Sequence, residues 1–387
     1  MKILQLSTGH LGGAGLAARR LNDSLVKAGI DSTFVALLSP SYLPGEHEIA
    51  IKRNWIKRTW GGWLARSQRF LSKQTLFTPF SANSIPLNYL LNFASPSETI
   101  IHIHNFQNLV SEKSIKAYSE AGYRIVLTLH DQRYFTGGCH YSFNCEQYES
   151  GCTKCPLIGS VASVIPRRKL LRSPIEKIHQ NKLEIIAPSK WIISRADQSQ
   201  ILGKFRKHHI HNLLGPNWSS SLVNLSQSQN TSMRVGIASM DPTSFIKGGD
   251  ILDQIINSPL TSNLHFVYLA NYSREGRPEE FWGQIDCLLV PSRADNSPNV
   301  IHEAKSLGVP VLASDVGGIP ELLEESDVCV PLEEMNAQTL ISALGEFRNQ
   351  KKKIGDSTNN FGATNEKEAD MLNKYLSVYR EMLSRRI

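Results

Sequence analysis

The chain lacks any long apolar run. Its 387 residues contain no stretch that approaches the roughly 20 apolar residues needed to span a bilayer. The start of the chain also lacks the apolar core of a signal peptide, because glycines and polar residues interrupt residues 1–21. We therefore expect a cytoplasmic protein without a membrane-spanning segment.

Acidic residues are scarce in the first part of the chain. Residues 1–220 hold 27 Lys and Arg against 13 Asp and Glu, whereas the remainder holds 15 against 22. Residues 52–73 contain seven basic residues, several tryptophans and no acid. This composition favours peripheral contact with an anionic membrane, at the inner face of the cell membrane. The same stripe also suits packing on its own domain. Nucleic-acid binding is disfavoured, since no recognition motif accompanies the charge.

Cysteine is rare, yet four of the six cysteines fall close together: Cys139, Cys145, Cys152 and Cys155. The last two have a Cys-x-x-Cys spacing, and tetrahedral Zn²⁺ accepts four thiolates. The other two spacings are not standard for a zinc site. A structural zinc, paired thiols that pin a loop, and free cysteines therefore all stay open.

The length predicts two domains. Strand-like and helix-like runs alternate through both halves, which predicts an α/β fold with a parallel sheet in each half. The expected strands are residues 2–7, 33–38, 99–104, 124–130, 184–187, 235–238, 265–270, 287–290, 309–313 and 327–331. The expected helices are residues 14–28, 111–121, 169–181, 190–201, 247–256, 299–307, 337–347 and 367–385. The predicted parts are a first domain at 1–215, a polar linker at 216–233, a second domain at 234–366 and a C-terminal helix at 367–387 that returns toward the first domain.

Residues 294–323 read ADNSPNVIHEAKSLGVPVLASDVGGIPELL and carry the most specific pattern of the chain. A loop holds Asp295, Pro298 opens a helix, and Glu303 is expected in its first turn. A buried strand then leads to the Gly317-Gly318 turn. A helix N-terminus attracts phosphate, and carboxylates accept hydrogen bonds from sugar hydroxyls. The combination therefore suits a nucleotide sugar.

This pattern resembles the donor-binding element of the retaining glycosyltransferases of family 4, a bacterial polysaccharide-type group also described as glycosyl transferases group 1. The family pattern is an acid, seven residues and then Glu, and Asp295 stands here where Glu is usual. The resemblance covers nearly the whole chain. It implies a GT-B fold, with two Rossmann-like doubly wound domains facing each other across a cleft.

The resemblance also implies roles for single residues. Glu303 would hold the nucleotide ribose, Asp295 a donor-sugar hydroxyl, and Lys247 would offset the charge of the diphosphate. His130, at the end of a predicted strand, matches the histidine of the family's first domain that contacts the donor sugar. The further donor-binding positions implied are Gly12, Gly13, Ser297, Pro298, Asn299, Val300, Gly317 and Gly318.

Two features of the sequence fit the family pattern less closely. His104 and Asn105 end a predicted strand and are candidates for the acceptor side, although a structural role suits them equally. The family usually has an Arg about six residues before the Lys, but Ser239, Met240 and Asp241 stand in that region here. Neutralisation of the diphosphate is therefore less complete than the family pattern requires.

The implied function is transfer of a sugar from a nucleoside diphosphate sugar to a polysaccharide, glycolipid or lipid-linked acceptor, with retention of anomeric configuration. No cofactor is required, which agrees with the lack of an Asp-x-Asp element. The alternatives are a catalytically weak GT-B protein that binds a nucleotide or partner, and a sugar-nucleotide epimerase. A nicotinamide enzyme is disfavoured, because Gly13-x-Gly15-x-x-Ala18 lacks the acid at the end of the second strand that would bind a ribose. The donor base, sugar, acceptor and linkage depend on pocket shape and are not predicted.

Overall fold

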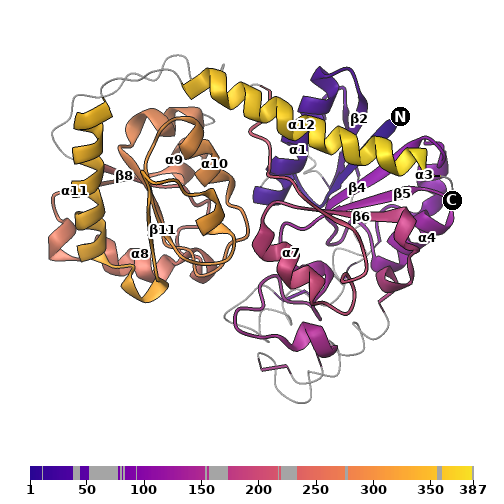
Figure 1. Cartoon of the computed structure of the whole chain (residues 1–387), viewed down its shortest axis with the longest axis horizontal. Coiled ribbons are helices and arrows are strands. Elements are labelled where there is room, and N and C mark those ends of the chain that lie inside the picture. The colour runs from indigo at the N-terminus through magenta and orange to yellow at the C-terminus, as the bar shows by residue number, and fades with distance from the viewer. Residues whose placement is uncertain are drawn as a thin grey trace. The chain divides into compact units, whose positions relative to one another are not determined.

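The computed structural model divides into two compact units, coloured by residue number in Figure 1. Unit 1 comprises Met1–Leu213 and Asp370–Ile387, and unit 2 comprises Leu214–Ala369. The structure describes residues 1–10, 12–37, 44–51, 77–78, 81, 83–92, 94–152, 155–156, 173–216, 218, 233–274, 278–354 and 360–385. The expected membrane segment at 52–73 and most of the expected linker at 216–233 lie outside these residues.

Unit 1 is built on a sheet of seven parallel strands in the order β3-β2-β1-β4-β5-β6-β7. The strands are β1 (Lys2–Ser7), β2 (Asp31–Ala36), β3 (Glu48–Ala50), β4 (Thr99–Asn105), β5 (Arg124–Thr128), β6 (Leu183–Ala187) and β7 (Lys207–His209). The central strands are buried almost throughout. Helices cover both faces of such a sheet, so its strands are continuous apolar runs rather than alternating ones.

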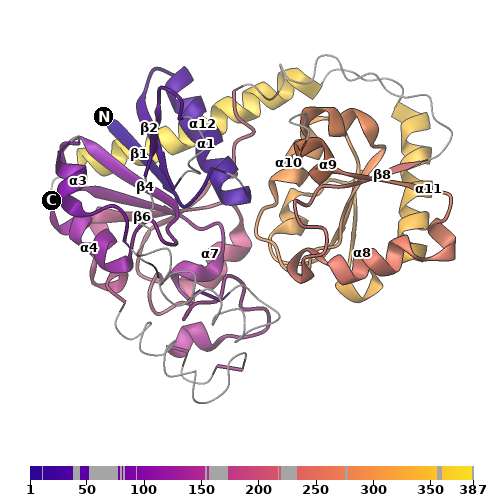
Figure 2. The same cartoon turned by 180° about the vertical axis from the view of Figure 1, so that it is seen from behind.

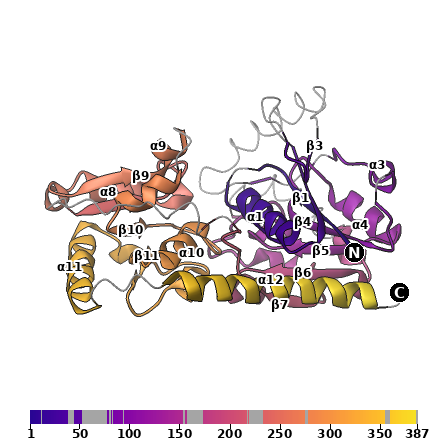
Figure 3. The ribbon, with the colours of Figure 1, turned by 90° about the horizontal axis from the view of Figure 1, so that it is seen from above.

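Five α-helices flank the described part of this sheet: α1 (Gly13–Lys27), α3 (Leu87–Leu91), α4 (Glu112–Glu120), α7 (Lys190–Asp197) and α12 (Asn360–Ser384), of which α12 packs here from Asp370 onward. Helices α1 and α12 bury apolar side chains against one face, among them Leu21, Leu25 and Met382. Helix α12 runs across the strands in front of the sheet in Figure 1 and behind it in Figure 2. Figure 3 shows the same helix along one side of the sheet.

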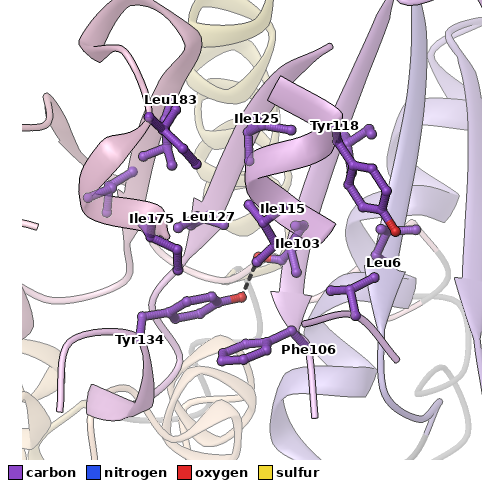
Figure 4. Packing of buried hydrophobic residues seen from close by; sticks show 14 of the residues in the cluster. Leu6, Ile103, Phe106, Ile115, Tyr118, Ile125, Leu127, Tyr134, Ile175 and Leu183 are labelled. Atoms are coloured by element: carbon purple, nitrogen blue, oxygen red, sulfur yellow. Dashed lines mark hydrogen bonds between the residues drawn. The ribbon is translucent and has the colours of Figure 1, made fainter. Parts of the chain in front are cut away.

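Helices α3, α4 and α7 cover the opposite face, where the largest core cluster lies. Figure 4 shows the centre of this cluster, with Leu6 and Leu127 of the sheet against Ile115 and Tyr118 of α4. The hydroxyl of Tyr134 donates to the backbone oxygen of Ile103 at 3.2 Å, so this buried phenol has a partner. The core anchors the segment that follows β5.

Unit 2 has a parallel five-stranded sheet in the order β12-β11-β10-β8-β9. Its strands are β8 (Arg234–Ile237), β9 (His265–Tyr268), β10 (Cys287–Val290), β11 (Val311–Ser314) and β12 (Val328–Val330). Its α-helices are α8 (Gly249–Ile256), α9 (Leu269–Arg274), α10 (Asn299–Ser306) and α11 (Ala337–Ile354). Helices α8 and α11 pack on one face, and α10 with the 3-10 helix Pro278–Gln284 packs on the other.

The predicted α/β class with two Rossmann-like domains is confirmed. The helix expected at residues 169–181 is wrong in its described part, because only the short 3-10 helices Ile175–Lys177 and Gln180–Lys182 reach into residues 173–181. Pro174 opens the first of these, and Ile178 after it is extended. Strands β3 and β7 and helix α3 were not predicted. No helix in the described ranges is long and apolar enough to cross a membrane.

Candidate active site

Three loops of unit 2 follow the neighbouring strands β8, β10 and β11. Parallel strands end at the same edge of a sheet, and ligands of doubly wound folds bind outside that edge, near the point where the strand order reverses. Strand β8 lies at such a point, since β9 flanks it on one side and β10 on the other. The loops carry Lys247, Asp295 and Gly317, three of the residues expected to bind the donor.

Lys247 and Asp295 form an ion pair between the β8 and β10 loops. The carboxylate is almost buried, at 8% exposure, whereas the ammonium side chain is 41% exposed. Asp295 Oδ1 also accepts a hydrogen bond from the backbone N–H of Asn296 at 2.9 Å. A nearly buried carboxylate thus pairs with a half-exposed ammonium group at the edge of the sheet where the strands end.

Two glycines allow the loops to approach this closely. Gly317 has a φ of +62°, and a Cβ there would lie 1.8 Å from the backbone oxygen of Asp295. Gly318 donates its N–H to the same oxygen at 3.2 Å. Gly248, at φ +74°, would place a Cβ 1.9 Å from the backbone oxygen of Pro291. Backbone contacts therefore lock the β8 and β11 loops onto the β10 loop.

Helix α10 follows directly, with Pro298 as its N-cap residue and Asn299 and Val300 as its first two residues. Ser297 Oγ lies 2.9 Å from His302 Nε2, which closes the loop onto the first turn. Glu303 is 5% exposed and lies in the second turn. The expectation that it lies in the first turn is wrong, because the helix begins at Asn299.

Arg293 is a second cation in these loops that sequence reasoning missed. Its backbone N–H donates to the oxygen of Ile246 at 2.8 Å, next to Lys247. Its guanidinium pairs with Asp250 at 3.2 Å and lies 4.6 Å from the ring centre of Phe245. Because Arg293 and Lys247 lie 46 positions apart in the numbering of the chain, no local motif signals that they are neighbours.

In unit 1, Gly12 is the N-cap residue of α1 with φ +80°, a conformation that favours glycine. Apart from its chain neighbours, neither Gly12 nor Gly13 would place a Cβ within 4 Å of an atom of the described residues. Gly15 is the crowded glycine, since its Cβ would lie 2.4 Å from the oxygen of Gly9. Packing therefore explains Gly15, whereas at Gly13 the structure leaves space beside the backbone.

His130 and His104 lie side by side after β5 and near the end of β4. His104 Nδ1 is 3.0 Å from His130 Nε2, and His104 Nε2 is 2.7 Å from Gln5 Oε1. Burial lowers the pKa of His130 to about 4, against a smaller opposite effect of Asp131. Burial also lowers the pKa of His104 well below its usual value. Both rings are thus neutral at physiological pH.

A second polar pair adjoins His130. His140 Nδ1 lies 2.6 Å from Asp131 Oδ2, and His140 Nε2 lies 2.8 Å from Thr78 Oγ1. Burial alone would raise the pKa of Asp131, but its interactions with His140 and Arg133 together outweigh burial and lower the pKa. Asn105 Oδ1 accepts from Gln107 N at 3.3 Å. Sequence reasoning had singled out neither Asp131 nor His140.

The predicted residues therefore form two groups. Unit 2 brings together Lys247, Asp295, Ser297, Pro298, Asn299, Val300, Glu303, Gly317 and Gly318, and unit 1 holds Gly12, Gly13, His104, Asn105 and His130.

The four clustered cysteines line one small cavity of about 20 Å³, together with Ser142 and Tyr148. None of the six cysteines of the chain, all of which are described, forms a disulfide. Burial raises the pKa of Cys145, so this thiol is protonated. In the described ranges no group of three or more His, Cys, Asp or Glu is arranged to hold a metal ion.

Two parallel sheets flanked by helices are the architecture of a GT-B fold, and solved structures agree with this fold. The chain is similar to sucrose-phosphate synthase from Thermosynechococcus elongatus, with a TM-score of 0.59, 13% identity and 99% of each chain covered. It is also similar to WaaG, a glycosyltransferase involved in lipopolysaccharide biosynthesis, with a TM-score of 0.57, 12% identity and coverage of 95% of this chain and 99% of that one. These likenesses establish the fold.

Residues 243–348 match the family model described as glycosyl transferases group 1. This match of one segment agrees with the resemblance to glycosyl transferases group 1 seen in the sequence, and family 4 stays a prediction. The chain is 26% identical over 227 residues to the putative colanic acid biosynthesis glycosyl transferase WcaC of Escherichia coli strain K12, covering 52% of this chain and 54% of that protein. It is 31% identical over 150 residues to an uncharacterized 41.2 kDa protein in the cps region of Klebsiella pneumoniae, covering 38% and 40%. The chain spans about half the length of the first of these relatives.

Proposed function

We propose that the protein is a glycosyltransferase that moves a sugar from a nucleoside diphosphate sugar to a glycan or lipid-linked acceptor in the synthesis of a bacterial polysaccharide. The observation that carries this proposal is the pairing of Lys247 with Asp295 beside the Gly317-Gly318 turn. The matched family segment, residues 243–348, includes all of these residues. A similar structure with a TM-score of 0.51, Anabaena Alr3699/HepE, was solved in complex with UDP and glucose.

In this proposal Glu303 binds hydroxyls of the nucleotide ribose, and Asp295 binds a hydroxyl of the donor sugar. Lys247 turns from Asp295 toward the diphosphate and stabilises the charge that develops as the glycosidic bond breaks. Its half-exposed side chain supports such a movement. The backbone N–H groups after Pro298 and around Gly317 and Gly318 then lie along the donor.

His130 is proposed to contact the donor sugar from unit 1 as a neutral ring, and the small residues Gly12 and Gly13 to allow close approach of substrate. His104 and Asn105 are proposed near the acceptor. Retention of configuration means that the acceptor attacks on the face from which the nucleotide leaves, where the departing phosphate helps to take its proton. We propose that the chemistry requires no cofactor.

The missing Arg before Lys247 favours a second candidate, a protein that binds a nucleotide and transfers sugar weakly. Arg293 supports the first candidate, since it is a second cation in the same loops, where it pairs with Asp250. A sugar-nucleotide epimerase would use the same fold without an acceptor.

One experiment separates these candidates. The protein is incubated with a panel of nucleoside diphosphate sugars, and release of nucleoside diphosphate is followed with and without lipid-linked and soluble glycan acceptors. Release that depends on an acceptor supports the transferase. Binding without release favours the weak candidate, and a changed sugar on an intact donor indicates an epimerase.

We further propose that the cysteine cavity holds a structural zinc ion. All four clustered thiols line it, and its volume of about 20 Å³ suits a single small occupant. Ser142, at 4% exposure, also lines the cavity, and its hydroxyl has no hydrogen-bond partner among the described residues. Metal binding would have to deprotonate the thiols and draw them together. Peripheral contact of residues 52–73 with anionic membranes stays a proposal from the sequence.

A further inference from the structure

The face of the unit 1 sheet that α12 covers changes from apolar to polar side chains along its strands. Toward the start of the strands this face carries apolar residues that belong to the core under the helix: Ile3, Ile100 and Val126. Successive side chains of a strand alternate between faces, so the same face next carries the residues two and four positions further on. These are Gln5, His102, Thr128 and His104, all of them at most 3% exposed. Buried polar groups of this kind are costly unless each has a partner.

Their partners form a continuous network that links α12 to His130. The hydroxyl of Tyr379 accepts a hydrogen bond from Gln5 Nε2 at 3.4 Å. Gln5 Oε1 lies 2.7 Å from His104 Nε2, and His104 Nδ1 lies 3.0 Å from His130 Nε2. A helix encoded more than 350 positions after β1 thus closes a chain of hydrogen bonds that ends at the proposed donor contact.

A short branch completes the network on the other side of Tyr379. The tyrosine hydroxyl lies 2.7 Å from His102 Nδ1, and His102 Nε2 lies 2.6 Å from Thr128 Oγ1. Burial raises the pKa of Tyr379 well above its usual value, so the phenol keeps its proton. A protonated phenol can donate to His102 Nδ1 while its oxygen accepts from Gln5 Nε2.

The directions of the remaining hydrogen bonds follow from the amide of Gln5. Its Oε1 can only accept, so His104 carries its proton on Nε2. Burial, with a smaller contribution from the neighbouring histidines, lowers the pKa of His104 well below its usual value and keeps the ring neutral. A neutral ring protonated on Nε2 has Nδ1 as its acceptor. His130 must therefore donate to it from Nε2.

We propose that Tyr379 is a positioning residue for His130: it orients the amide of Gln5 and, through His104, holds the His130 ring in place as the Nε2–H tautomer. The proposal deepens the proposed function and rests on it, since His130 is there the contact with the donor sugar. The tautomer of a histidine is set by the hydrogen bond that its other nitrogen makes, and a wrong tautomer presents the wrong group to a substrate. Tyr379 acts on the sugar only through this network.

The test removes one hydroxyl and reads the histidine directly. Tyr379→Phe keeps the aromatic ring, which packs between α12 and the sheet, and removes only the hydroxyl. Tyr375→Phe is the matched control, since this tyrosine lies one turn earlier on α12 and its hydroxyl contacts the backbone oxygen of His211 at 3.4 Å. The ¹⁵N chemical shifts of the His130 ring report its tautomer, and donor kinetics with the best nucleotide sugar report its use.

We expect wild type and Tyr375→Phe to show His130 as the Nε2–H tautomer. In Tyr379→Phe the Gln5 amide loses its anchor, so the His130 signals move toward an average of the two tautomers. The kcat/KM for the donor falls on the order of tenfold, the scale of one lost hydrogen bond. Affinity for the free nucleoside diphosphate, which Lys247 and Glu303 of unit 2 are proposed to bind, stays unchanged.

If Tyr379→Phe does not fold, Gln5→Leu keeps the tyrosine and tests the part of the network that runs from Gln5 through His104 to His130. An unchanged His130 tautomer in a folded variant overturns the proposal, even if activity falls, because the hydroxyl would then be merely structural. A shifted tautomer in a protein that transfers no sugar from any donor leaves the network standing and overturns the proposed function instead.

Discussion

The backbone oxygen of Asp295 lies where the side chain of any residue but glycine at position 317 would have to be, since a Cβ there would come within 1.8 Å of it. The contact fixes the turn after β11 against the loop that carries the Asp295 carboxylate. It explains, without reference to a ligand, why glycine stands at position 317.

Gly317→Ala should therefore loosen the site. We expect a loss of about 1–3 kcal/mol in the free energy of unfolding, because the φ of +62° and the close oxygen both oppose a Cβ. Donor affinity should fall as well. Gly345→Ala is the control, since Gly345 lies in α11 with nothing within 4 Å of its Cβ, and helix propensity predicts a small gain in stability. Thermal unfolding and calorimetric donor titration measure both. Equal stability of the two variants would contradict the packing argument.

Lys247→Gln should reduce turnover far more than stability. Its ion pair with Asp295 is 41% exposed on the lysine side, and pairs of this kind contribute about 0–1 kcal/mol to folding. If the ammonium stabilises the leaving diphosphate, kcat falls on the order of 10²-fold or more. Lys374→Gln, which breaks an exposed pair with Asp370 on α12, is the control. A normal kcat in Lys247→Gln would remove the lysine from the mechanism.

Glu303→Gln should weaken donor binding by about 1–3 kcal/mol, because one acceptor oxygen and the negative charge proposed to bind the ribose hydroxyls are lost. Glu325→Gln changes an exposed glutamate of the same unit and should bind the donor as wild type does. Titration with the nucleoside diphosphate alone isolates the ribose contact. Identical dissociation constants for both variants would reassign Glu303 to a structural role.

Because three histidines are buried, we predict that the free energy of unfolding falls in mild acid. Burial lowers the pKa of His102, His104 and His130 in the folded chain, while in the unfolded chain each titrates near its ordinary value. Below that value the unfolded state binds more protons, so stability is complete above about pH 6.5 and declines below it. At pH 5.5 the loss should be on the order of 3–4 kcal/mol relative to pH 7.5.

Urea unfolding at the two pH values measures this difference. His265→Gln removes an exposed histidine and should leave the difference unchanged, whereas His104→Gln should reduce it by about one third. A wild-type stability independent of pH over this range would mean that the three rings are not neutral and buried together.

A zinc ion in the cysteine cavity predicts about one metal per chain in protein purified under reducing conditions without chelator. Cys152→Ser should release it and lower the thermal stability of the loop beside His130. Cys329→Ser, which changes an exposed cysteine away from the cavity, should retain the metal. Metal-free wild-type protein would leave paired or free thiols as the interpretation of the cluster.

Local pattern sufficed for much of the fold. The bounds of β1 and β10 coincide with those expected, because a short buried strand is an apolar run that ends where the chain turns. Strand β7 was missed because Lys207–His209 is polar and pairs along only one edge. A strand of three polar residues gives no periodic signal.

The site was predictable in its motifs and not in its connections. Asp295 and Lys247 are 48 positions apart, and only the sheet order brings them together. Gln5 and Tyr379 are 374 positions apart. In the sequence, Tyr379 is indistinguishable from the other apolar residues of an amphipathic helix. Contacts that tertiary packing creates between distant segments leave no trace in local spacing.

The packing of α12 on the first sheet has a consequence for synthesis on the ribosome. Tyr375, Leu376, Val378, Tyr379 and Met382 complete the core over β1, β4 and β5. After Leu213 has emerged, roughly 10 to 30 s of translation pass before these residues follow. During that interval the nascent first unit carries an uncovered apolar and histidine-rich face, a natural substrate for chaperones that bind near the exit tunnel.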